Sequence, residues 1–374
     1  MTSPLFNGRQ TVSGGSAAAG TTRRSLLKTA GKATAVLAAA ALSLTACSTG
    51  PASSSADTGS SVAESAQFPV TIKNVFGETT IKEQPKRVVT ISWVNDDIAL
   101  ALGVVPVGVP KNEWGNNEKG STPWKDAALE KLGASFGSEK APVQFSEADG
   151  INFTEIAKLN PDVILAAYSG LEAADYKKLN EIAPVVAQPE LAYGTPWQEA
   201  TTLIGKALGK TAEAEKLVTD TEATIKAEAA KYPQLTGKTF IYGNLEPAKG
   251  DGVNVYLAAD NRPRFLTEIG MKPAAIVEEK SKGSKEFFTA WSAEKANELE
   301  SDVFVTWVPD AKTKDQIVKD PLLSQIPAVK KGALVADSDN TLTLAISASS
   351  PLSLPWALDK FLPQLAAGAD AAAK

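Results

Sequence analysis

The sequence TAEAEKLVTDTEATIKAEAAKY, residues 211–232, divides the globular part of this 374-residue chain in two. It runs for 22 residues without Gly or Pro, and Pro233 follows it directly. Leu217 and Ile225 fall on one face of the helix that this pattern predicts, and Glu213 suits the positive N-terminal end of the helix dipole. At 1.5 Å per residue this helix would be about 33 Å long. It could therefore bridge two lobes.

Short β-rich runs alternate with helical patterns on both sides of this segment, after a hairpin that we expect at residues 70–81. The predicted strands lie at 87–91, 162–165, 184–186, 239–242, 302–305 and 333–335. The predicted helices lie at 96–102, 153–159, 172–182 and 352–365. This alternation is typical of an α/β fold, in which helices cover a largely parallel sheet.

The globular part is longer than one hydrophobic core usually serves. Residues 68–374 are about 300 residues, whereas single domains are commonly about 100–200 residues. We therefore expect an N-terminal lobe at 68–210 and a C-terminal lobe at 233–374, joined by one long rigid helix at 211–232.

The N-terminal region has the order of an export signal. Arg23 and Arg24 lie in a basic front end, residues 33–46 carry no charge, and the tetrapeptide LTAC ends at Cys47, the only cysteine. An apolar run of about 14 residues is too short to span a bilayer, which takes about 20. Residues 1–46 are thus predicted to be a signal peptide, with the twin-arginine and the general export routes both open. Cys47 is predicted to be lipidated and to hold the protein on the outer face of the cytoplasmic membrane.

The composition after Cys47 excludes several classes of function. Residues 47–67 are small and polar, which predicts a disordered tether. The chain has no histidine, so Cys/His metal sites and Ser-His-Asp triads are not expected. Removal of residues 1–46 leaves 33 basic and 43 acidic residues, a net charge of −10, which does not suit nucleic-acid binding.

Five segments, spread over nearly the whole mature chain, resemble the siderophore and cobalamin family of ABC-transporter substrate-binding lipoproteins. They are QPKRVV with IALALGVVPVGV (84–89 and 98–109), IAKLNPDVIL (156–165), residues 176–186, residues 320–335 and SPLSLPWAL (350–358). The resemblance implies a ligand cleft between the two lobes and no cofactor. It implies a monomer that delivers a ferric siderophore to a membrane permease driven by a cytoplasmic ATPase. Cobalamin and haem remain open as ligands.

Aromatic side chains fall just past several predicted strand ends, where α/β proteins place their ligand sites. For any one of them, core packing is as good an explanation as ligand contact. Arg262 and Arg264 lie in a loop that opens a helix, and two guanidinium groups suit an oxygen-rich ligand. The predicted ligand-binding residues are Trp93, Trp124, Tyr168, Tyr193, Trp197, Tyr242, Arg262 and Arg264.

The small number of arginines indicates the type of chelate. Ferric catecholates carry about three negative charges, whereas the mature chain has only three arginines, and the third, Arg87, belongs to the start of a strand. A hydroxamate or mixed siderophore is therefore favoured. A hexadentate siderophore fills every iron position itself, so the protein needs no metal ligand of its own.

Family members dock on the permease through one Glu on each lobe. Glu294 in WSAEK (291–295) matches this position in the C-terminal lobe. In the N-terminal lobe, Thr154 stands where the family has the acid, and Glu155 could replace it. The spacing of Asn152 and Glu155 also fits a helix capping box without any docking role.

An enzyme of another class is the rival interpretation. SAEK at 292–295 and SDN at 338–340 reproduce two elements of penicillin-recognising serine acyl-enzymes, but the chain contains no Lys-Thr-Gly. The sequence therefore predicts a binding protein and not an enzyme.

Overall fold

The computed structural model describes residues 68–247 and 252–374. The predicted signal peptide, Cys47 and the tether lie outside the described residues. The described part of the chain begins with a hairpin of β1 (Val70–Asn74) and β2 (Gly77–Ile81), which are paired antiparallel. Gly77 turns the chain with a φ of 129°, a conformation that side chains other than glycine rarely adopt.

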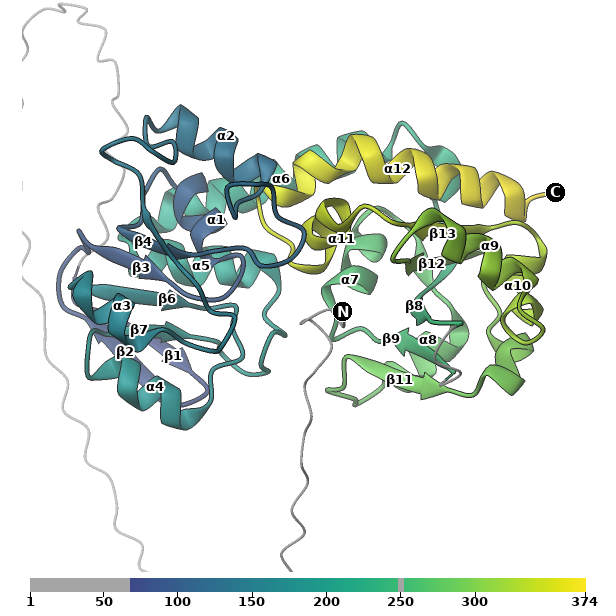
Figure 1. Ribbon diagram of the computed structural model, residues 1–374, viewed down its shortest axis with the longest axis horizontal. Helices are drawn as coiled ribbons and strands as arrows, with labels where there is room; N and C mark the ends of the chain where they lie inside the picture. Colours follow the sequence, from purple (N-terminus) through teal and green to yellow (C-terminus); the bar gives the residue numbers. More distant parts are fainter. Residues whose placement is uncertain (1–67, 248–251) are drawn as a thin grey trace, which may run out of the picture. The chain divides into compact units, whose positions relative to one another are not determined.

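The N-terminal lobe is built on a five-stranded sheet in the order β5-β4-β3-β6-β7, with every pair parallel (Figure 1). The strands are β3 (Val88–Thr90), β4 (Gly108–Pro110), β5 (Val143–Phe145), β6 (Val163–Ala166) and β7 (Val185–Ala187). The helices are α1 (Asn95–Ala101), α2 (Pro123–Lys131), α3 (Phe153–Lys158), α4 (Ala173–Asn180) and α5 (Trp197–Ala207).

Alternate residues of these short strands enter two different cores. Val88 and Leu165 pack with α1 and α5, whereas Val89 and Ile164 pack with α3 and α4. Because both faces are covered, the strands are apolar throughout instead of alternating with polar residues. The predicted strands and helices of this lobe are confirmed to within two residues at each end, but β4 and β5 were not predicted.

The C-terminal lobe carries a six-stranded sheet in the order β11-β9-β8-β12-β13, with β10 paired to β8. The strands are β8 (Thr239–Leu245), β9 (Val253–Tyr256), β10 (Lys272–Pro273), β11 (Phe288–Trp291), β12 (Val303–Trp307) and β13 (Leu334–Asp337). The α-helices are α7 (Asn261–Glu268), α8 (Ala275–Ser281), α9 (Ala311–Lys319), α10 (Pro327–Lys330), α11 (Asn340–Ser347) and α12 (Ser353–Ala372), and the 3₁₀ turns are η2 (Pro233–Leu235), η3 (Ala293–Glu298) and η4 (Leu323–Gln325).

The second sheet is largely parallel, as predicted, with an antiparallel edge. The pairs β8–β12, β12–β13 and β8–β10 are parallel, but β8–β9 and β9–β11 are antiparallel. The sheet is therefore mixed. Sequence alternation does not reveal this antiparallel edge, because β9 and β11 are four residues each.

In both lobes an aspartate side chain holds the start of a central strand. In the N-terminal lobe, Asp162 accepts hydrogen bonds from the backbone N–H groups of Lys86 and Arg87, at 2.7 and 3.0 Å. In the C-terminal lobe, Asp302 accepts one from the backbone N–H of Thr239 at 2.8 Å. In each case an aspartate just before one strand fixes the first residues of its parallel neighbour.

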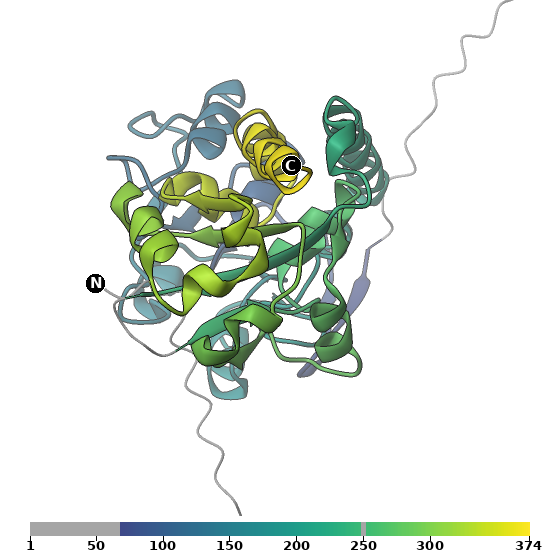
Figure 2. The same ribbon diagram turned by 90° about the vertical axis from the view of Figure 1, so that its right-hand side faces the viewer.

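Two long helices connect the lobes. The predicted bridging helix is confirmed as α6 (Thr211–Ala229), which ends three residues before Tyr232. It packs against α5 of the N-terminal lobe and against α12 of the C-terminal lobe, and Figures 1 and 2 show α12 running beside it. One hydrophobic cluster runs through this region, from Ile98 and Ile204 to Phe361. The lobes are therefore joined by continuous packing as well as by α6.

Candidate ligand-binding site

A strained loop presents Trp93 at the end of β3. Ser92 and Val94 have φ angles of 60° and 75°, and the second is an unfavourable conformation for a β-branched residue. Asn95, which is fully buried, holds the loop. Its Nδ2 donates to the carbonyl oxygens of Ile91 and Tyr168 at 2.8 and 2.9 Å, and its Oδ1 accepts from the Tyr168 backbone N–H at 3.1 Å. Asn95 therefore ties the loop after β3 to the loop after β6.

Three predicted aromatic residues meet at this edge of the N-terminal lobe. The ring of Tyr193 lies 5.7 Å from that of Trp93 and 5.9 Å from that of Tyr168, measured between centroids. Tyr193 is 40% exposed, Trp93 is partly exposed, and Tyr168 is buried. The ring of Tyr193 lies so close to Gly170 that a Cβ there would come within 2.3 Å of it. The chain thus needs glycine at 170 to keep this aromatic cluster.

Glu147 is a residue of this edge that the sequence analysis missed. Its Oε2 accepts a hydrogen bond of 2.9 Å from the backbone N–H of Ser92, while its Oε1 is buried and has no hydrogen-bond partner among the described residues. Burial raises the pKa of Glu147 to about 7; the bond from Ser92 opposes the shift and the Asp96 carboxylate adds to it. Glu147 follows β5, which was itself not predicted, so no sequence signal placed it beside Trp93.

The C-terminal lobe contributes two buried tyrosines and an arginine. Tyr242 in β8 and Tyr256 in β9 lie with their ring centroids 5.8 Å apart. The Arg262 guanidinium lies over the ring of Tyr256, with Cζ 3.6 Å from the centroid, as in a cation–π contact. Burial raises the pKa of Tyr168, Tyr242 and Tyr256 above the ordinary value, so all three phenols are neutral.

Asp260 neutralises this arginine. Nε of Arg262 donates to Oδ1 of Asp260 at 2.8 Å, and Nη2 donates to Oδ2 at 2.6 Å. Both side chains are largely buried, at 12% and 9% exposure. Burial lowers the pKa of Arg262, but the Asp260 carboxylate raises it, with smaller contributions from Tyr256 and Tyr242, and the net shift is upward. The site therefore contains a charged pair rather than the free guanidinium that the sequence suggested.

Arg264 links the lobes and does not join the aromatic rings. Its Nη1 donates to the carbonyl oxygen of Gly194 in the N-terminal lobe at 2.8 Å, and its Nε donates to that of Ala258 at 3.0 Å. It lines a groove of about 630 Å³ with Lys73, Lys285 and other residues from both lobes. None of Trp93, Tyr168, Tyr242 and Arg262 lines that groove, so it is distinct from the aromatic site.

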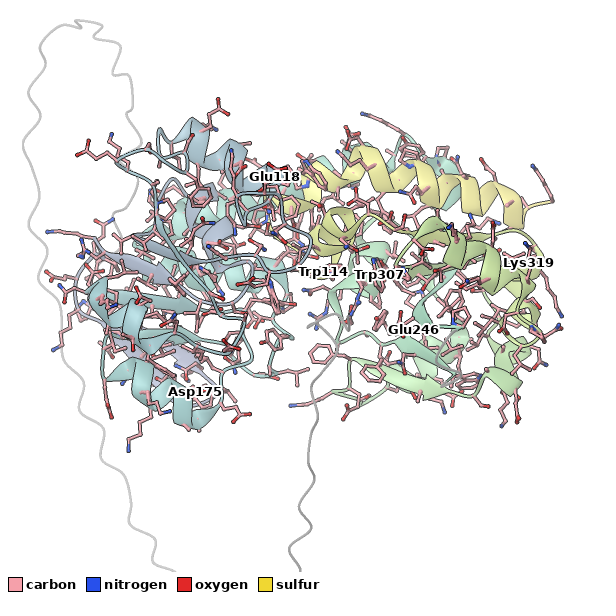
Figure 3. All side chains as sticks on the ribbon, viewed as in Figure 1. Trp114, Glu118, Asp175, Glu246, Trp307 and Lys319 are labelled. Atoms are coloured by element: carbon pink, nitrogen blue, oxygen red, sulfur yellow. The ribbon has the colours of Figure 1, made fainter. Side chains whose placement is uncertain are left out.

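Further contacts join the aromatic residues of the N-terminal lobe to residues of the C-terminal lobe. Asn261 at the start of α7 donates from Nδ2 to the Tyr168 hydroxyl at 3.3 Å. Trp114, from the loop after β4, lies 6.0 Å from Trp307 at the end of β12, edge to face. Figure 3 shows these two labelled tryptophans next to each other, each from a different lobe. Neither Trp114 nor Trp307 is among the predicted ligand-binding residues.

Two predicted ligand residues lie elsewhere. Trp124 in α2 is 5% exposed, and its Nε1 donates to Oδ2 of Asp97 at 2.7 Å. Trp197 at the start of α5 is 4% exposed, and its Nε1 donates to Oε1 of Glu268 at 3.2 Å. Both indoles are packed in the core with their N–H groups bonded, so we leave them out of the candidate site.

The two candidate docking acids differ in their surroundings. Glu294 is exposed in the first turn of η3, whose N-cap Ser292 accepts from the Glu294 backbone N–H at 3.3 Å. Glu155 forms an ion pair with Lys158 at 2.7 Å, and its backbone N–H donates to Oδ1 of Asn152 at 3.2 Å. Half of the predicted capping box is thus present, and Thr154 beside it is exposed.

Within 68–247 and 252–374, no group of three or more Cys, His, Asp and Glu side chains could hold a metal ion. In the same part of the chain, none of the helices has the length and apolar character needed to cross a bilayer.

Comparisons with known proteins agree with this geometry. A model of the periplasmic binding protein family matches residues 88–341. PiaA of Streptococcus pneumoniae in complex with ferrichrome has a TM-score of 0.74 and 36% identity, over 80% of this chain and 99% of that chain. SirA of Staphylococcus aureus complexed with staphyloferrin B has a TM-score of 0.62 and 26% identity, over 79% of this chain and 98% of that chain.

A curated relative shows the same likeness in sequence. The Fe(3+)-citrate-binding protein YfmC of Bacillus subtilis is 27% identical over 307 residues, which cover 81% of this chain and 87% of its own length. The family match spans most of the described chain and includes the Trp93, Tyr168, Tyr242 and Arg262 positions. The predicted resemblance is confirmed: the chain belongs to the periplasmic binding protein family.

Proposed function

We propose that this protein is the extracytoplasmic substrate-binding component of an ABC importer for ferric siderophores, and that it holds a hydroxamate-type chelate between its two lobes. The observation that carries the proposal is the contact between the aromatic residues of the two lobes. Tyr168, whose ring lies beside Tyr193, bonds Asn261 next to the Asp260–Arg262 pair. Trp114 of the N-terminal lobe packs on Trp307 of the C-terminal lobe. The 36% identity to ferrichrome-bound PiaA supports a ligand of the same class.

The chemistry of the site suits the organic shell of a chelate. Aromatic faces pack against apolar and amide parts of a ligand, while a few fixed polar groups set its orientation. A siderophore that fills all iron positions needs no side chain on the metal. The phenols of the site are neutral, and Tyr168 is tied to Asn261, which disfavours a tyrosinate ligand for haem.

Delivery would use the surface and the anchor predicted from the sequence. Cys47 would carry the lipid that holds the protein on the outer face of the cytoplasmic membrane. Glu294 and Glu155 would dock on permease subunits driven by a cytoplasmic ATPase, and the protein would act as a monomer. The binding role leaves no step for an acyl-enzyme: Ser292 accepts a hydrogen bond as the N-cap of η3, and Lys295 is exposed.

A titration of the intrinsic tryptophan fluorescence tests the proposal. The purified protein is titrated with ferrichrome, ferric enterobactin, ferric citrate, haemin and cyanocobalamin, and each siderophore is also titrated without iron. We expect saturable quenching by ferrichrome, with weaker or no response to iron-free ferrichrome. Saturation by cyanocobalamin or haemin alone would replace the ferric siderophore with that ligand.

A further inference from the structure

The charge balance at the C-terminal half of the site is set by a residue that the family resemblance did not single out. Asp260 is the N-cap of α7 and accepts from the backbone N–H of Arg262 at 2.9 Å. The same carboxylate bonds two nitrogens of the Arg262 guanidinium, at 2.8 and 2.6 Å. One side chain therefore fixes both the helix start and the position of the arginine.

This pairing removes the attraction that a lone arginine would exert on an anion. A guanidinium in contact with a carboxylate presents a dipole instead of a full positive charge, and that dipole field falls off faster with distance. Because both side chains are largely buried, water does not screen the pair from a ligand beside it. The guanidinium is also in contact with the ring of Tyr256, with Cζ 3.6 Å from the ring centroid.

Among the described residues, one further arginine and several acids lie near the aromatic rings. Arg264 is directed at the Gly194 carbonyl on the seam between the lobes. Burial is the main cause of the raised pKa values of Tyr242, Tyr256 and Tyr193, and the carboxylates of Asp337, Glu246 and Glu147 respectively add to it. Within the described residues, acidic groups therefore act on the tyrosines of both lobes.

We propose that Asp260 is a specificity-determining residue: by neutralising Arg262, it makes the site select ferric chelates without net charge and discriminate against anionic ones. This inference rests on the proposed function and narrows it to a charge class of ligand. The site would accept a neutral ferric trihydroxamate, and it would disfavour an equally shaped chelate that carries carboxylates.

The substitution Asp260→Asn removes the negative charge and keeps one oxygen that can accept from the Arg262 guanidinium. Asparagine is as good an N-cap as aspartate, so the start of α7 is kept while the carboxylate is removed. The matched control is Asp320→Asn. Asp320 also caps backbone N–H groups, those of Leu322 and Leu323 at 2.9 and 2.8 Å. It follows Lys319, which Figure 3 places on the far side of the C-terminal lobe from Trp307.

The probes are ferrichrome, which is neutral, and ferrichrome A, which has the same iron shell on a similar cyclic peptide and carries three carboxylates. Dissociation constants are measured by isothermal titration calorimetry on the full chain at low ionic strength, where charge effects are least screened. We expect the wild type to bind ferrichrome more tightly. Asp260→Asn should improve the relative affinity for ferrichrome A by about tenfold, the size expected from one unit charge acting on several at this range. Asp320→Asn should leave the ratio unchanged.

The outcomes separate this inference from the proposed function. An unchanged ratio in Asp260→Asn, with ferrichrome binding intact, overturns the role of Asp260 and leaves the proposed function standing. A wild type that binds no ferric chelate overturns the proposed function itself. If Asp260→Asn does not fold, Asp260→Ser provides a second uncharged N-cap, and a wild type that prefers ferrichrome A would overturn the inference without any variant.

Discussion

The hydroxyl of Ser350, at the start of α12, donates a hydrogen bond of 2.7 Å to Oδ2 of Asp97 in α1, across 253 residues of sequence. The same oxygen accepts from the indole N–H of Trp124 at 2.7 Å. Asp97 is buried beside Asp96, whose carboxylate pairs with the buried Lys125 at 2.5 Å. Burial and the Asp96 charge raise the pKa of Asp97, so its two hydrogen bonds are needed to hold the carboxylate inside the protein. This polar contact belongs to both lobes.

Removal of the Ser350 hydroxyl should weaken the joint between the lobes. Ser350→Ala leaves Asp97 with one donor fewer in a buried place and also removes the acceptor of the Ser353 backbone N–H at 2.9 Å. We expect a loss of about 1–3 kcal/mol in the free energy of unfolding. Urea denaturation measures the change. The control is Ser349→Ala, because Ser349 is also buried but donates only within its own segment, to the carbonyl oxygen of Ile346 at 2.7 Å. An equal loss of unfolding free energy in the two variants would show that the contact between Ser350 and Asp97 adds nothing to stability.

Glu147 should make stability depend on pH. Its pKa is about 7 in the folded protein, against an ordinary value of 4.5, so the folded state holds the proton more tightly than the unfolded state. The free energy of unfolding should therefore fall as the pH rises from about 4.5 to 7. Glu147→Gln removes this slope, and at pH 8 the variant should be more stable than the wild type by about 3 kcal/mol at most.

Thermal unfolding between pH 4 and pH 8 checks this expectation. Glu118→Gln serves as the control, because it removes the same charge from an exposed loop position (Figure 3). A pH slope that persists unchanged in Glu147→Gln would show that other buried acids, such as Asp97, cause it.

Substitution of Trp93 should weaken ligand binding, whereas substitution of Trp124 should lower stability. Trp93→Ala removes a partly exposed ring that contacts Tyr193, and we expect about tenfold weaker ferrichrome binding with little change in stability. Trp124→Phe removes the indole N–H that bonds Asp97, and we expect a loss of about 1–3 kcal/mol in stability with normal binding. Calorimetric titration and urea denaturation of both variants measure the two effects. Weaker binding in Trp124→Phe at unchanged stability would restore Trp124 to the site.

The docking acids should affect uptake without affecting binding. Glu294 is exposed and Glu155 is paired only with an exposed lysine, so replacing either with Ala should cost little stability. We expect both variants to bind ferrichrome normally and to support slower uptake of radiolabelled iron by cells. Glu130→Ala, an exposed acid at the end of α2, is the control. Uptake reduced only in Glu294→Ala would remove Glu155 from the docking surface.

The sequence predicted the parts of this protein that depend on local patterns. The buried strands are short runs of Val and Ile flanked by helices, and the absence of Gly and Pro from 211 to 232 marked α6. The aromatic residues that follow β3 and β6 could be placed near each other, because parallel strands end at one edge of a sheet. In the structure the rings of Trp93 and Tyr168 both lie beside Tyr193, and their contact with a ligand stays a prediction.

What the sequence did not predict depends on side-chain partners. Asp260 and Arg262 are two residues apart in the chain, but only the folded loop shows that they pair bidentately. Trp124 lies in a Pro- and Gly-rich segment that resembled a loop, whereas Pro123 starts a helix that buries the indole. The position of Glu147 near Trp93 depends on the pairing of β5 with β4, which the sequence did not predict. In each case the role of the residue depends on a contact between distant segments or on a local turn. The periodicity of apolar residues in the sequence carries no information about such contacts.

The location of the iron is the most direct test of this account. Crystals of the complex with ferrichrome would give an anomalous scattering peak at the iron absorption edge. The account predicts one strong peak between the lobes, with Trp93 and Tyr193 on one side and Arg262 on the other. A peak in the groove beside Lys73 and Lys285, or no bound iron at saturating ferrichrome, would contradict it.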